Sequence, residues 1–314
     1  MPGRIHSHTT PVRRLVLPGA DVVVKMESAN LHGGTKDRSA GWILDRAYAR
    51  GELTARTTVV ESSSGNFALA LAMRCRALGI EFVPVVDPYL NHTTEQTLAA
   101  VCSRIEYVHT PDPSGAYLPA RLARVGELVE SLPHAYWPNQ YANTDAADAH
   151  YHLTGAELVD ELDELDLLFV GVGTGATITG VAHRVLERFP LARVVAVDAA
   201  GSRIFGDTPA PRHIPGLGST IVPAILDMSV IDEVVHVPEL EAVRACHELV
   251  REHGLFGGGS TGSVFAAIRR YLARNPTGRR PTIACISPDG GQAYLDSVYD
   301  PQWVHRTLIE GAES

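Results

Sequence analysis

Four short segments of the chain combine glycine with amine, hydroxyl or amide side chains, a mixture that suits anion binding and nucleophilic chemistry. The first, residues 30–38, places Lys36 two residues after a pair of glycines. It is not a P-loop, because a P-loop lysine is followed by Ser or Thr and here Asp37 follows. A lysine at a helix start opposes the helix dipole, and partial burial beside that positive dipole end lowers the pKa of its amine. Lys36 is therefore a candidate reactive amine, although a lone lysine is more often simply solvated.

The second segment, residues 61–66, carries three serines, a glycine and an amide between an expected strand and an expected helix. Helix N-termini bind carboxylates and phosphates, and Ser63, Ser64 and Asn66 add polar side chains there. Helix capping alone would need only one of these residues. We therefore expect a small anion to bind here.

The third and fourth segments are glycine-rich and again precede expected helices. Residues 171–177 fit the pattern G-x-G-x-x-G/A, and Asp198 ends the following strand, as in a dinucleotide fold. The same turn also holds a single phosphate, so the pattern specifies a phosphate better than it specifies which one. In residues 256–263, glycines allow close backbone approach and Ser260 offers a neutral hydroxyl; the alternative is that Ser260 only caps the next helix.

The elements that must position these segments alternate along the chain. Strand-like runs are expected at residues 57–61, 80–86, 105–108, 167–170, 193–197, 234–237 and 282–286. Helical patterns lie between them, for example at residues 40–47, ended by Gly51, and 67–78, ended by Gly79. Strands joined by crossover helices predict an α/β fold with open, mostly parallel twisted sheets flanked by helices and ligands at the carboxyl ends of the strands.

Composition narrows the classes of protein. The 27 Lys and Arg against 36 Asp and Glu give a formal net charge of −9, which argues against nucleic-acid binding. No apolar run approaches a membrane span and no signal peptide is expected. The four cysteines show no C-x-x-C pattern and are expected as buried thiols in the cytoplasm. His150 and His152 form an H-x-H pair, but no third ligand at a suitable spacing predicts a metal site.

Together, the four segments resemble the motifs of the fold-type II pyridoxal 5'-phosphate enzymes, the superfamily of cysteine synthase and cystathionine β-synthase, and they occur in that family's order. Residues 135–143, 196–207, 214–219 and 288–296 are similar to the branch that forms 2,3-diaminopropionate, the N-(2-amino-2-carboxyethyl)-L-glutamate synthases. The resemblance implies transfer of the glutamate amine onto O-phospho-L-serine, for siderophore or peptide-antibiotic synthesis. Phe67 follows Asn66 where cysteine synthases usually have threonine, which leaves the natural acceptor open.

The resemblance also implies the architecture and the surroundings of the enzyme. A smaller, mobile substrate-binding domain is expected from residues 35–142, and a larger cofactor-binding domain from residues 1–34 plus 143–314. A cytoplasmic homodimer that acts on small amino acids, without nucleic-acid or membrane partners, is expected.

Roles for individual residues follow from the same resemblance. Lys36 is expected to bind the cofactor covalently and to act as general base, Asn66 to contact its phenolic oxygen and Ser260 its pyridine nitrogen. The expected cofactor-phosphate contacts are Gly173, Thr174, Gly175, Ala176 and Thr177. The expected substrate contacts are Ser63, Ser64, Asn66 and Gln140 for the carboxylate, with Arg121 and Tyr141 for phosphate or acceptor.

Three alternatives stay open. A cysteine synthase that uses O-acetylserine or O-phosphoserine would share every catalytic residue. An NAD-binding oxidoreductase would use residues 171–176 and Asp198, but it explains only one of the four segments. A non-catalytic binding protein on the same fold would have no need of Lys36.

Overall fold

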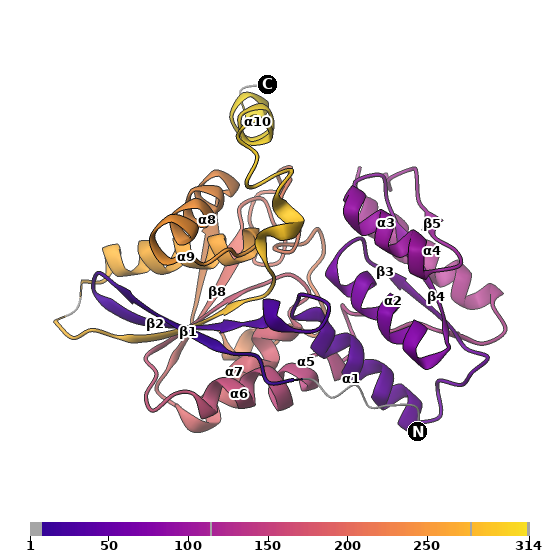
Figure 1. The fold of residues 1–314 in the computed structure, drawn as a ribbon, viewed down its shortest axis with the longest axis horizontal. Helices are drawn as coiled ribbons and strands as arrows, with labels where there is room; N and C mark the ends of the chain where they lie inside the picture. The colour runs from indigo at the N-terminus through magenta and orange to yellow at the C-terminus, as the bar shows by residue number, and fades with distance from the viewer. Residues whose placement is uncertain (1–7, 114, 277, 313–314) are drawn as a thin grey trace.

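The computed structural model describes residues 8–113, 115–276 and 278–312, and its strands form two separate sheets (Figure 1). The larger sheet has six strands in the order β1-β2-β10-β7-β8-β9, and the smaller has four in the order β5-β4-β3-β6. The strands of the larger sheet are β1 (Val12–Leu17), β2 (Ala20–Met26), β7 (Leu167–Gly171), β8 (Arg193–Ala199), β9 (Glu233–Val237) and β10 (Thr282–Ser287). Those of the smaller sheet are β3 (Thr58–Ser62), β4 (Glu81–Val86), β5 (Glu106–Tyr107) and β6 (Ala135–Tyr136).

All strand pairs are parallel except the β1–β2 hairpin, whose register pairs Leu17 with Ala20. Gly19 has a φ of 91° in the hairpin turn, a backbone conformation that glycine adopts without steric cost. Parallel pairing requires crossover connections, which the helices supply. The mostly parallel α/β fold predicted from the sequence is confirmed.

Helices cover both faces of the larger sheet, because its strands are apolar on both sides. In β7, Leu167 and Phe169 pack toward α8 (Glu239–His253) and α9 (Gly259–Arg274). Leu168 and Val170 pack on the opposite face, toward α6 (Ala156–Asp160) and α7 (Ala176–Arg188). This double coverage is characteristic of parallel sheets and gives their strands continuous apolar runs.

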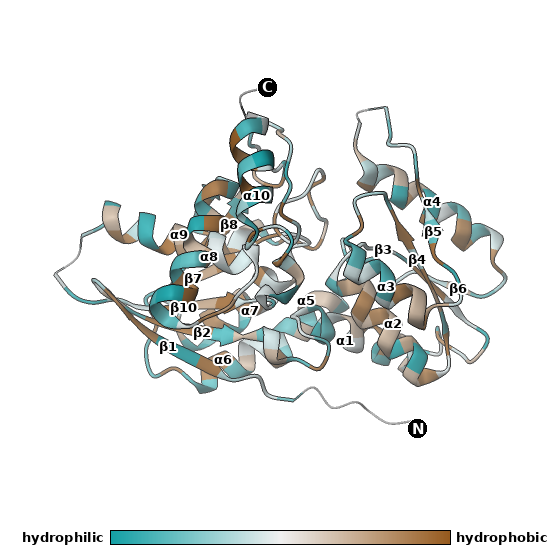
Figure 2. Cartoon of the chain, turned by 45° about the horizontal axis from the view of Figure 1, so that its top comes forward, coloured by the Kyte–Doolittle hydropathy of each residue, from teal (hydrophilic) through white to brown (hydrophobic). Residues whose placement is uncertain are grey.

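The smaller sheet is covered in the same way. Helices α1 (Lys36–Ala49), α2 (Asn66–Leu78) and α3 (His92–Val101) pack on one face and α4 (Tyr117–Ser131) on the other. α1 also packs against α5 (Asp145–Ala149), which continues through a π-helical turn, His150–Gly155, into α6. Near the C-terminus, α10 (Pro301–Val304) projects from the larger sheet (Figure 1). Figure 2 shows hydrophobic colour along the strands and hydrophilic colour on many outer helical turns.

All seven strands expected from the sequence are present, and both expected helices end at left-handed glycines, Gly51 (φ 76°) and Gly79 (φ 69°). The strands β1 and β2 and the short β6 were not among those seven. No helix among the described residues is long and apolar enough to cross a membrane. Cys75, Cys246 and Cys285 are buried free thiols, as expected, while Cys102 is half-buried.

Candidate active site

A cavity of about 250 Å³ lies where the carboxyl ends of β3, β7 and β10 meet the N-termini of the helices that follow. Its lining includes twelve of the residues singled out from the sequence: Lys36, Ser63, Ser64, Asn66, Arg121, Gln140, Tyr141, Gly173, Thr174, Gly175, Thr177 and Ser260. Parallel α/β sheets bind ligands at this edge. Ala176 is the exception, because its side chain is buried in the apolar core around α1 and α2.

Lys36 is the first residue of α1, so its amine sits at the positive end of the helix dipole. Burial lowers the pKa of Lys36 to about 8, while the nearby carboxylate of Asp289 opposes that shift. The amine donates a hydrogen bond of 3.4 Å to Thr174 Oγ1, in the loop before α7. The fraction of Lys36 that is neutral and nucleophilic near physiological pH is therefore larger than for an ordinary lysine.

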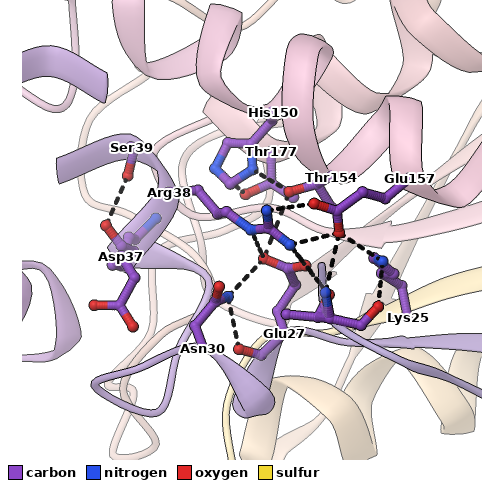
Figure 3. Close-up of polar contacts among 12 residues, drawn as sticks. Lys25, Glu27, Asn30, Asp37, Arg38, Ser39, His150, Thr154, Glu157 and Thr177 are labelled. Carbon is purple, nitrogen blue, oxygen red and sulfur yellow. Dashed lines mark hydrogen bonds and ion pairs between the residues drawn. The ribbon is translucent and has the colours of Figure 1, made fainter. Parts of the chain in front are cut away.

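A buried ionic network fixes the helix that carries Lys36 (Figure 3). The guanidinium of Arg38 lies between two carboxylates, Glu27 (Nε–Oε2, 3.1 Å) and Glu157 (Nη1–Oε1, 2.6 Å). The Lys25 amine also lies 2.8 Å from Glu157, and Thr10 Oγ1 donates to Glu27 at 2.8 Å. Such a network is costly to break once buried, because removing one partner leaves an uncompensated charge. It ties the start of α1 to β2 and α6.

The glycine loop before α7 is shaped to approach a ligand closely. Gly175 has a φ of 86°, and a Cβ on Gly173 would come within 3.0 Å of the Gly216 carbonyl oxygen, so neither position readily takes a larger residue. The first turn of a helix leaves backbone N–H groups without intrahelical partners, and because the start of α7 lines the cavity these groups could bind an anion there.

The hydroxyl of Thr177, at the start of α7, is held in place by a hydrogen bond with His150. Thr177 Oγ1 lies 3.3 Å from His150 Nε2, and His150 Nδ1 lies 3.0 Å from Thr154 Oγ1 (Figure 3). Burial, reinforced by the positive charges of Lys36 and Arg38, lowers the pKa of His150 well below its ordinary value. His150 is therefore a neutral, hydrogen-bonded residue.

The serine loop and the segment around Gln140 form one wall of the cavity. Gln140 Nε2 donates to the Ser62 carbonyl at 3.1 Å, and Ser63 Oγ accepts from the Ala68 N–H at 3.2 Å. The cap position of α2 is Gly65, without a side-chain cap, so Ser64 and Asn66 do not cap the helix. Both residues line the cavity, where Ser64 contacts Arg121 and Asn66 contacts Asp289.

Buried Glu61 lies behind this wall. It accepts hydrogen bonds from the Ser62 N–H (2.8 Å), Trp137 Nε1 (3.3 Å) and the Gln140 N–H (3.3 Å). Burial nevertheless raises its pKa to about 8. Glu61 thus joins the strand before the serine loop to the segment that carries Gln140.

Arg121 lies at the outer side of the cavity, on α4. Its Nη1 donates to Ser64 Oγ at 3.3 Å, and its Nε lies 3.3 Å from an Asp87 carboxylate oxygen. The residue is 9% exposed, so it is not a solvated arginine on the outer face of a helix. Tyr141 also lines the cavity, and burial raises its pKa to about 12, which keeps the phenol protonated.

Ser260 is the second residue of α9, and the cap position is Gly258, so Ser260 does not cap the helix. Its hydroxyl faces the turn at Gly216, where an added Cβ would come within 3.0 Å of Ser260 Oγ. The hydroxyl therefore lies beside Gly216, whose carbonyl oxygen also lies close to Gly173 in the glycine loop before α7.

The sequence did not single out the buried acid in this cavity. Asp289 follows β10, is 6% exposed, and accepts hydrogen bonds of 2.8 Å from both Asn66 Nδ2 and the Tyr294 hydroxyl. Burial raises the pKa of Asp289, while Tyr294, Asn66 and Lys36 hold it down. Residues 288–296 were noted only for their resemblance to the diaminopropionate branch, which was the available signal.

Within the part of the chain that it describes, the structure does not assemble the two alternative sites, a dinucleotide site that uses Asp198 and a metal site that uses His150 and His152. Asp198 is fully buried and accepts from the Ala199 N–H at 2.8 Å, so it does not face a ribose. His152 stacks on Trp42, with ring centroids 5.3 Å apart. Among the described residues, no group of three or more His, Cys, Asp or Glu side chains is placed to hold a metal ion.

The cavity fits pyridoxal phosphate. Lys36 supplies a buried amine of lowered pKa, the start of α7 supplies N–H groups without intrahelical partners next to two glycines that do not readily take a side chain, and Ser260 supplies a neutral hydroxyl. These groups suit the aldehyde, the phosphate and the ring nitrogen, respectively. The fold and the cavity thus define an enzyme class in which one lysine and one phosphate loop hold an aromatic aldehyde cofactor.

Residues 5–289 match the family described as pyridoxal-phosphate dependent enzyme, and the chain belongs to this family. It is 43% identical over 294 residues to N-(2-amino-2-carboxyethyl)-L-glutamate synthase of Ralstonia nicotianae (strain ATCC BAA-1114 / GMI1000), covering 93% of this chain and 86% of that protein. The resemblance predicted from the sequence is confirmed. The protein is a pyridoxal-phosphate dependent enzyme of the β-replacement, transferase type.

Solved structures agree with this assignment. An O-acetylserine dependent cystathionine β-synthase from Helicobacter pylori superposes with a TM-score of 0.83 at 29% identity, over 94% of this chain and 95% of that one. A hydrogen sulfide-producing enzyme from Fusobacterium nucleatum gives 0.84 at 28% identity, over 91% and 96%. O-ureido-L-serine synthase gives 0.84 at 30% identity, over 93% and 92%.

Proposed function

We propose that the enzyme transfers the amine of L-glutamate to the β-carbon of O-phospho-L-serine, giving N-(2-amino-2-carboxyethyl)-L-glutamate and phosphate. The product is a precursor of 2,3-diaminopropionate for siderophore or peptide-antibiotic synthesis. The similarity to the Ralstonia enzyme over almost the whole chain carries this proposal.

The charges of the cavity support anionic substrates. Among its described lining residues, Lys36 and Arg121 are the cationic side chains and Asp289 is the acidic one. O-phosphoserine brings a carboxylate and a phosphate, and glutamate brings two carboxylates. Arg121 is buried and contacts Asp87 through Nε and Ser64 through Nη1, and because a guanidinium carries five N–H donors it can also bind one of these anions.

Each group has a task in the reaction. Bound pyridoxal phosphate supplies an electron sink that stabilises negative charge at the substrate Cα. The substrate carboxylate binds the serine loop, through Ser63, Ser64 and the Asn66 region, and Gln140. The freed Lys36 amine removes the α-proton, and its lowered pKa suits a general base. Arg121 stabilises the departing phosphate.

The second half reverses the proton transfer. The glutamate amine attacks Cβ, and protonated Lys36 returns its proton to Cα. Ser260 places a neutral hydroxyl, rather than a carboxylate, at the pyridine nitrogen. This choice limits protonation of the ring and favours β-elimination over transamination.

The architecture suits closure around a substrate. Ser63, Ser64, Asn66 and Arg121 come from the part of the chain that forms the smaller sheet, whereas Gly173–Thr177 and Ser260 follow strands of the larger one. We therefore propose that residues 35–142 form a mobile substrate-binding domain that closes onto residues 1–34 plus 143–314. A cytoplasmic homodimer without nucleic-acid or membrane partners is part of the same proposal.

An absorption titration tests the function. The visible band of the loaded enzyme should change when O-phospho-L-serine is added and return only when L-glutamate follows, with product identified by mass spectrometry. The neighbours named for O-acetylserine and for hydrogen sulfide favour one second candidate, a cysteine synthase. Recovery with sulfide but not with glutamate would establish that candidate instead.

A further inference from the structure

Asp289 lies at the point where three of the four site segments meet. Its backbone pairs with Gly34, two residues before Lys36, and its carbonyl accepts the Gly258 N–H at 3.2 Å, two residues before Ser260. Its side chain contacts Asn66. The residue therefore joins the end of β10 to the loops of the lysine, the neutral hydroxyl and the amide.

The contact with Asn66 spans the two sheets. Asn66 begins α2, beside the smaller sheet, and Asp289 follows the larger sheet 223 residues later. Asn66 Nδ2 donates to Asp289 Oδ2 at 2.8 Å, and the Tyr294 hydroxyl donates to the same oxygen at 2.8 Å. Because a carboxylate only accepts, this contact requires the nitrogen of the amide to face Asp289.

The orientation of the amide has a consequence for its other hydrogen. An amide nitrogen carries two donors, of which Asp289 uses one. Asn66 also lines the cavity, so the second N–H remains for a ligand oxygen. Without Asp289 the amide could rotate and present its carbonyl oxygen, which would repel a phenolate.

The environment is built for a carboxylate at this position. A Cβ on Gly258 would overlap Asp289 Oδ1, so the glycine makes room for the acid. Oδ1 is buried and has no hydrogen-bond partner among the described residues. The nearby Lys36 amine provides compensating positive charge.

We propose that Asp289 is a positioning residue of the cofactor site, which fixes the Asn66 amide with its nitrogen as donor to the phenolic oxygen of pyridoxal phosphate and keeps a negative charge beside Lys36. The proposal rests on the proposed role of Asn66. Tyr294 supports the same carboxylate from behind.

Two substitutions at Asp289 separate its role as a hydrogen-bond acceptor from the effect of its negative charge. Asp289→Ala removes both, whereas Asp289→Asn keeps an acceptor oxygen for Asn66 and removes the charge. Loss of one charge-assisted hydrogen bond should weaken cofactor binding about tenfold in Asp289→Ala and about threefold or less in Asp289→Asn, measured by titrating the apo protein with pyridoxal phosphate.

A double-mutant cycle tests whether Asp289 acts through Asn66. Asn66→Ala should also weaken binding about tenfold, and the double variant Asn66→Ala/Asp289→Ala should be no weaker than about twofold beyond Asn66→Ala alone. If the double variant lost affinity by the product of the two single losses, the residues would act independently and the proposal would be overturned. Normal binding by Asn66→Ala would overturn the proposed role of Asn66 and this inference with it, whereas weak binding by Asn66→Ala with normal binding by Asp289→Ala overturns this inference alone.

A second readout needs no cofactor. The rate at which an amine reagent modifies Lys36 in the apo protein, followed by peptide mass spectrometry across pH, reports the protonation of its amine. Both Asp289 variants should shift the midpoint to lower pH, because they remove the negative charge that stabilises the protonated form, and Asn66→Ala should not. An unchanged midpoint in Asp289→Asn, which preserves the packing, would overturn the charge part even if Asp289→Ala does not fold.

Discussion

The Lys36 amine lies 3.4 Å from Thr174 Oγ1, so the reactive group at the start of α1 touches the loop that begins α7, 138 residues later. The contact places the Lys36 amine directly beside the glycine loop before α7. A cofactor bonded to this amine would therefore lie beside the glycine loop that we propose binds its phosphate.

Replacing Lys36 with alanine should abolish turnover and the visible absorption of the bound cofactor, because the amine is both the covalent attachment point and the general base. The absorption spectrum and a product assay check both effects. Lys36→Arg is the matched control, since it keeps the positive charge but not the nucleophile. Turnover or a normal visible band in Lys36→Ala would show that another residue holds the cofactor.

Replacing Ser260 with aspartate should slow β-elimination and allow side reactions such as transamination, because a carboxylate stabilises the protonated ring nitrogen. Stopped-flow spectra and product analysis check this. Ser260→Ala, which also lacks a carboxylate, should not gain those side reactions. An unchanged rate and product profile in Ser260→Asp would argue against a contact with the ring nitrogen.

Replacing Arg121 with glutamine should lower kcat/KM for O-phospho-L-serine by about 10- to 100-fold, the loss expected for a hydrogen bond to a charged group. The value for O-acetyl-L-serine should change by about threefold or less, because acetate carries less charge as a leaving group. Arg121→Lys is the control that keeps the charge. Equal losses with both substrates would instead assign Arg121 to the acceptor or to the packing of α4.

Replacing Glu61 with glutamine should flatten the pH dependence of stability. The pKa of Glu61 is about 8 in the folded protein and 4.5 in the unfolded chain, so the folded state binds more protons between these values. The free energy of unfolding therefore falls as pH rises from 4.5 to 8, by roughly 1.4 kcal/mol per pH unit at most. Glutamine resembles the protonated acid and cannot titrate.

Urea denaturation at pH 5 and pH 8 measures this difference. The wild-type protein should lose more stability than Glu61→Gln across the interval, with other titrating groups common to both proteins. If the free energies of unfolding of the two proteins differed by the same amount at pH 5 and at pH 8, the pKa of Glu61 would lie outside this interval.

The sequence predicts the site better than it predicts the connections that hold the site together. Lys36, Ser63, Gly173 and Ser260 stand in short segments whose composition is local, so one stretch of chain is enough to identify each. Asp289 is different, because its importance depends on Asn66, 223 residues away, and an isolated Pro-Asp pair carries no such signal.

The same distinction applies to the fold. The apolar run of β8 identifies a buried strand without knowledge of its neighbours. β2 escaped prediction although four of its seven residues are buried apolar or alanine side chains, because buried Lys25 interrupts the apolar run. The buried Lys25 amine is paired with Glu157 and Thr10, partners that no local pattern shows.

The position of β10 determines when the larger sheet can form during synthesis. β10 lies between β2 and β7, and its register pairs Thr282 with Asp21. During synthesis the β1–β2 hairpin is made long before β10, so its inner edge stays unpaired until almost the entire chain has been made. The smaller sheet needs only the chain from β3 to β6 and can fold earlier, whereas the unpaired edge of β2 stays open to aggregation until β10 has been made.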